Sequence, residues 1–211
     1  MATGTIATSL VVCSALILLS IYYLGLIKKL GYSKEISGFT AGVLIGFILL
    51  NSLYLLIAIP SCLVLGLILA FVSSKYPIEL YVTAFLGSSG FAFWFLSWSY
   101  PCLFKSLIGK IAFFVIVYIS FCIALKHVPT IFPYVCHALT GAYMCILGLD
   151  IITNAGILNI FLLILTAKSK IDYSTKSFIP LLIYIVLFFL SFYHYCIRHH
   201  PKPMSLIMIQ A

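Results

Sequence analysis

Long apolar runs without charges, separated by single charged residues or short polar clusters, organise this chain. A charge at the centre of a bilayer costs roughly 2.5–3.5 kcal/mol on insertion scales, so charges tend to mark the ends of spans. A spanning helix needs about 20 residues. The run 36–74 fits two helices joined by a turn, which we place at Asn51 and Ser52. The pattern predicts an all-α polytopic membrane helical bundle with seven transmembrane helices, near 6–27, 36–53, 55–73, 79–98, 108–125, 132–152 and 178–197.

The run 151–167 is the ambiguous segment of this pattern. Only Ile157–Thr166 is strongly apolar, and ten residues reach about half of the hydrocarbon core. We predict an interfacial or re-entrant segment inside a loop at 153–177, and eight spans is the alternative. A short basic tail at 198–211 completes a single membrane domain over 1–211.

Composition excludes several classes of protein. Hydrophobic residues make up 64% of the chain and charged residues 8%, against about half and about a quarter in soluble domains. The net charge of +8 does not indicate nucleic-acid binding, because the basic residues are scattered singly along the chain. The predicted partner is therefore the lipid bilayer, and no nucleic acid is expected.

Basic residues also predict the orientation of the chain in the membrane. Lys28, Lys29, Lys34 and Lys75 lie in the early loops on one side, and the other early loop carries no Lys or Arg. Cytosolic loops carry an excess of Lys and Arg. We predict that the N-terminus is outside or lumenal and the C-terminus cytosolic, with plasma membrane and endomembrane both open.

Small residues recur at helical spacing in three of the predicted spans. Glycines four residues apart let helix backbones approach closely, and such approach drives helix association in lipid. We expect packing within the chain, with a homo-oligomer or contacts to other membrane proteins as the alternative. The predicted helix-packing residues are Gly38, Gly42 and Gly46 of the second span, Gly87 of the fourth, and Gly141 and Gly148 of the sixth.

Asp150 and His137 form the candidate polar site. Acids within spans often mark ion or proton paths, and Asp150 is the one acid close to a span interior. His137 lies thirteen residues earlier, about 20 Å along the helix, so the two side chains are not expected to pair. Cys196 at the membrane boundary is a candidate for S-palmitoylation. Neither a metal site nor a cofactor is predicted, although His194, Cys196, His199 and His200 cluster near the end of the last span.

The segment Gly87-Ser88-Ser89-Gly90 fits the G-x-S-G pattern of rhomboid-type intramembrane proteases. That chemistry would use Ser89 as nucleophile and His137 of the sixth span as base. The link between the first two spans is too short for the long membrane-embedded loop of these proteases. Small residues that favour helix packing also explain the segment, so catalytic residues are not predicted.

The order of these features resembles the eukaryotic domain shared by transmembrane protein 198 and transmembrane 7 superfamily member 3. The resemblance covers nearly the whole chain, and it implies a seven-helix membrane domain without catalytic residues. Three stretches carry it: Leu24–Leu50 with Gly31-Tyr32, the stretch from Gly66 through Phe85-Leu86-Gly87, and Leu139-Thr140-Gly141-Ala142 leading to Gly148-Leu149-Asp150.

The expected function is that of a non-enzymatic multi-pass membrane protein. The resemblance implies a scaffold or receptor-accessory protein, which would associate through its glycine-lined helix faces. A transporter or channel that uses Asp150 is the first alternative, and a rhomboid-like serine protease that uses Ser89 and His137 is the second.

Overall fold

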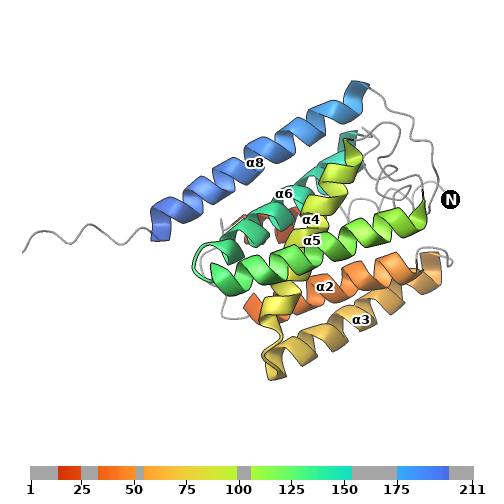
Figure 1. Ribbon diagram of the computed structural model, residues 1–211. Helices are drawn as coiled ribbons and strands as arrows, with labels where there is room; N and C mark the ends of the chain where they lie inside the picture. Colours follow the sequence, from red (N-terminus) through yellow and green to blue (C-terminus); the bar gives the residue numbers. More distant parts are fainter. Residues whose placement is uncertain (1–13, 25–32, 51–54, 99–105, 154–174, 200–211) are drawn as a thin grey trace, which may run out of the picture.

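A computed structural model describes residues 14–24, 33–50, 55–98, 106–153 and 175–199. Every regular element in these ranges is an α-helix, which confirms the predicted all-α helical bundle (Figure 1). The first helix is Ser14–Tyr23. The others are α2 (Ser33–Leu50), α3 (Leu55–Lys75), α4 (Glu79–Ser97), α5 (Leu107–His127), α6 (Phe132–Thr153) and α8 (Thr175–His199).

The helices run back and forth between two ends of the bundle. In Figure 1 the α3–α4 and α5–α6 turns and the end of α8 lie toward the left, whereas α4 and α6 end toward the right. Helices α2 and α3 pack side by side as an antiparallel pair. Helix α4 contacts α2, α5 and α6, and α6 also packs on α8. Helix α4 is therefore the central element that joins the α2–α3 pair to the rest.

Three helices of the described part are long and apolar enough to cross a membrane: Glu79–Ser97, Ile108–His127 and Phe132–Asp150. Shorter apolar helices are described at Ser14–Tyr23, Pro60–Lys75 and Ile179–Tyr195. These lengths and compositions support an integral membrane bundle. The count of seven spans stays a prediction, and most of the loop at 153–177 and of the tail at 198–211 lies outside the described residues.

Helix ends differ from the predicted span ends because a helix continues beyond its apolar part. Helix α2 begins at Ser33, so Lys34 and Glu35 lie in its first turn, where an acid interacts favourably with the helix dipole. Helix α8 begins at Thr175, three residues before the predicted span. Pro60 lies inside α3, and the predicted turn at Asn51 and Ser52 lies outside the described residues.

The core is built mainly between α4, α6 and α8. Phe93 of α4 stacks on Tyr143 of α6, with ring centroids 5.8 Å apart. Trp94 of α4 stacks on Tyr184 of α8 at 5.0 Å, and its indole N–H donates to the carbonyl oxygen of Leu181 at 3.2 Å. In lipid, where burial of apolar surface gives no drive between helices, such close ring packing and hydrogen bonds hold the helices together.

Candidate functional site

The predicted glycine stripe of α2 lies directly against α3. A Cβ atom built on Gly42 would lie 2.5 Å from the carbonyl oxygen of Leu65 and 2.8 Å from the Cα of Gly66. On Gly38 it would meet the Ser73 side chain and, at 2.7 Å, the Leu69 carbonyl oxygen. On Gly46 it would lie 2.9 Å from the Cα of Cys62. All three contacts involve backbone atoms, so the stripe permits a close approach of α2 and α3.

Gly87 and Gly141 of the predicted set also face neighbouring helices of the same chain. A Cβ on Gly87 of α4 would lie 2.7 Å from the Cβ of Cys136 in α6. A Cβ on Gly141 of α6 would lie 2.9 Å from both the Cβ of Tyr23 and the backbone nitrogen of Leu24. Gly148 is buried in α6. The glycine faces are thus occupied by contacts within the bundle.

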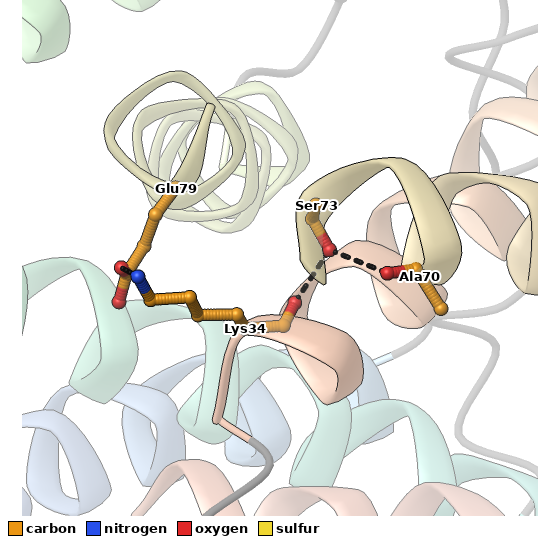
Figure 2. A network of polar contacts seen from close by, with 4 residues as sticks. All are labelled: Lys34, Ala70, Ser73 and Glu79. Carbon is orange, nitrogen blue, oxygen red and sulfur yellow. Dashed lines mark hydrogen bonds and ion pairs between the residues drawn. The ribbon is translucent and has the colours of Figure 1, made fainter. Parts of the chain in front are cut away.

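A polar network ties the first turn of α2 to the end of α3 and the start of α4 (Figure 2). The Ser73 hydroxyl donates to the carbonyl oxygens of Lys34 at 2.8 Å and Ala70 at 3.0 Å. The Lys34 ammonium pairs with the Glu79 carboxylate at 3.1 Å. Both charged side chains are about half exposed, so the ion pair itself adds little stability, on the order of 0–1 kcal/mol. Its main effect is to hold the Lys34 side chain toward α4.

Asp150 is buried near the end of α6, with 4% of its surface exposed. Its position at the end of the predicted sixth span also allowed contact with water, but the structure buries the side chain. Lys110 in the first turns of α5 is equally buried, with 3% exposed. Charged groups are seldom buried in membrane helices without a structural or functional role.

His137 lies at the other end of α6 and stacks on Tyr23 of the first helix. Their ring centroids are 5.6 Å apart with an interplanar angle of 26°. The Tyr23 side chain is almost fully buried, and Ser37 and Thr40 of α2 lie near its phenol. His137 and Asp150 are thus not brought together, as the helical spacing predicted. Tyr23 was not among the residues predicted from the sequence, although it lies near the end of the first apolar run.

Ser89 lines a small cavity between α2, α4 and α6. The volume is about 20 Å³, enough for about one water molecule. The wall includes Thr140 and Tyr143 of α6, while His137 faces the first helix. In the described part of the chain no hydrogen bond joins Ser89 to His137. The arrangement lacks the contact by which a base activates a serine nucleophile.

Two other candidate sites lie at the end of α8. Cys196 falls within α8, but its side chain lies outside the described part of the structure. Among the described residues, no group of three or more His, Cys, Asp and Glu side chains is placed to hold a metal ion.

Apolar helices, close glycine contacts and a packed aromatic core define an integral membrane protein built as a helical bundle. The family model of the TM7S3/TM198-like domain matches residues 13–196, and the chain belongs to this family. This confirms the resemblance found in the sequence. Searches of curated proteins and of solved structures gave no significant match.

Proposed function

We propose that this protein is a non-enzymatic membrane scaffold or receptor-accessory protein that binds other membrane proteins within the bilayer. The observation that supports this function most directly is the close packing of the bundle. Its glycine faces are filled by neighbouring helices, and the central cavity beside Ser89 has a volume of about 20 Å³. A substrate pathway or a catalytic cleft between α2, α4 and α6 needs far more room than this cavity, since ligand pockets usually hold about 300–1,000 Å³.

The surface that we propose for partners is the outer face of α5, not the glycine faces. Only 17% of the α5 span is buried, against 67% for α4 and 61% for α6. The outer face carries β-branched side chains, whose stiff χ1 angles lose little freedom when another helix packs on them. These exposed residues are Ile108, Ile111, Val115, Ile116, Ile119 and Ile123.

A bulky substitution on α5 tests this surface. We expect Ile119→Trp to lower the recovery of membrane proteins that co-purify with the chain by about tenfold, which corresponds to about 1.4 kcal/mol. Val186→Trp on α8 is the matched control, because Val186 is similarly exposed on another helix. The measurement is quantitative mass spectrometry of complexes purified from native membranes. Equal recovery for wild type and both variants would contradict the proposal.

We propose the orientation of the bundle in the membrane from the positions of its basic residues, as in the sequence analysis above. Lys34 at the start of α2, Lys75 at the end of α3 and Lys126 at the end of α5 lie toward one end (Figure 1). The positive-inside rule supports a cytosolic location for this end, with the C-terminus on the same side.

A transporter or channel that uses Asp150 is the second candidate, because the carboxylate is buried within the bundle. For the scaffold we expect vesicles with purified wild type to show the same H⁺ and K⁺ flux as protein-free vesicles. Asp150→Asn should then change nothing. Flux that is present with wild type, absent with Asp150→Asn and retained with Glu79→Gln would replace the scaffold by the transport function.

The rhomboid-like reaction has less support, since Ser89 and His137 are not joined by a hydrogen bond.

A further inference from the structure

A groove opens on the outside of the bundle between the first helix and the α2–α3 pair. Its volume is about 380 Å³, which is within the range of ligand pockets. Its walls are apolar and come from all three helices. The lining residues are Leu18, Leu19, Tyr22, Glu35, Ile36, Phe39 and Ala70.

The groove ends at the Glu35 carboxylate, at the end of the bundle where Lys34, Lys75 and Lys126 lie. Glu35 lies in the first turn of α2, and the phenol of Tyr22 is close enough to feel its charge. Two described cations at this end are engaged elsewhere: Lys34 pairs with Glu79, and the Lys75 ammonium lies 4.5 Å from the centroid of the Phe71 ring. Within the described ranges Glu35 has no ion-pair partner. The rim of an apolar groove thus offers a negative charge.

We propose that this groove binds one phospholipid whose headgroup carries a primary amine. The ammonium of the headgroup pairs with the Glu35 carboxylate. The glycerol region and the first part of one acyl chain lie along Leu19, Ile36 and Phe39. The Tyr22 phenol, at the same rim, is placed to donate a hydrogen bond to the phosphate or an ester oxygen.

Charge and shape together favour this occupant over other lipids. An anionic headgroup would be repelled by Glu35, and a quaternary ammonium has no N–H with which to donate to a carboxylate. A primary ammonium can donate three hydrogen bonds and is small enough to reach a carboxylate at a groove rim. The groove is formed by the first helix, α2 and α3, so it is separate from the α5 surface proposed for protein partners.

Native mass spectrometry of the full chain with defined lipids tests the site. The probes are phosphatidylethanolamine, phosphatidylcholine and phosphatidylglycerol with identical acyl chains. For wild type we expect phosphatidylethanolamine to be retained about three- to fivefold better than either of the others, the size of one exposed ion pair. Glu35→Gln should abolish this preference. Lys126→Gln changes one charge on α5, which does not line the groove, and should keep the preference over phosphatidylcholine.

A second pair of variants tests the groove itself. Ala70→Phe fills the groove and should lower the retention of phosphatidylethanolamine to the level of phosphatidylcholine. Leu67→Phe adds an aromatic ring to the same helix at an exposed position that does not line the groove, and it should have no effect. Thermal melting of both variants shows whether they fold. Equal retention of the three lipids by wild type, a preference for phosphatidylglycerol, or a preference that survives Glu35→Gln would each overturn the proposal.

Discussion

Replacing Gly42 with leucine is expected to separate α2 from α3 and to lower the free energy of unfolding by about 3 kcal/mol or more. The new Cβ would lie 2.5 Å from the Leu65 carbonyl oxygen and 2.8 Å from the Gly66 Cα. Both are backbone atoms, so they cannot rotate away and the helix axes must move apart. The measurement is reversible unfolding in mixed micelles, followed by the loss of helical circular dichroism.

Two further variants test whether the loss of stability in Gly42→Leu comes from the close contact between α2 and α3. Ala112→Leu places the same side chain at an exposed position of α5 and should unfold like wild type. Gly66→Ala should cost less than Gly42→Leu, because its Cβ would meet the movable side chains of Val43 and Phe39. If Gly42→Leu and Ala112→Leu had the same free energy of unfolding, α2 and α3 would not be in close contact at Gly42.

Replacing Gly141 with leucine is expected to displace the first helix from α6. The Cβ would lie 2.9 Å from both the Tyr23 Cβ and the Leu24 backbone nitrogen, and the rest of the leucine would need the space that Tyr23 fills. We expect a loss of about 3 kcal/mol in the free energy of unfolding, at the upper end of the usual cost of overpacking. Because the first helix also forms a wall of the lipid groove, retention of phosphatidylethanolamine should fall as well.

Cysteine labelling reports the displacement of the first helix directly. Ser20 is buried on this helix, so Ser20→Cys should react slowly with a membrane-permeable maleimide in the otherwise wild-type chain. Adding Gly141→Leu should raise the labelling rate at position 20 at least about tenfold, as for a protecting contact worth about 1.4 kcal/mol. Peptide-resolved mass spectrometry separates this thiol from the native cysteines. An unchanged rate would mean that Gly141 does not seat the first helix.

Several features of the site were predictable because they depend on local spacing. The four-residue spacing of Gly38, Gly42 and Gly46 places them on one helix face, and the structure shows that face against α3. The separation of His137 from Asp150 follows from the helical rise alone. Other features depend on which helices pack together, and the spacing of residues along the chain does not show this. The burial of Lys110, the stacking of Tyr23 on His137 and the groove beside Glu35 all arise between helices that are distant in sequence.

The sequence by itself determined that the chain forms apolar helices in a membrane, and it was sufficient to identify the family. This was possible because the cost of placing charges in lipid acts on each segment separately. Each span is therefore visible in the sequence as a run without charges. Only the tertiary structure decided which helix each glycine faces and where a groove remains. A stripe of small residues fits any close neighbour equally well, so the choice depends on how all the helices pack at once.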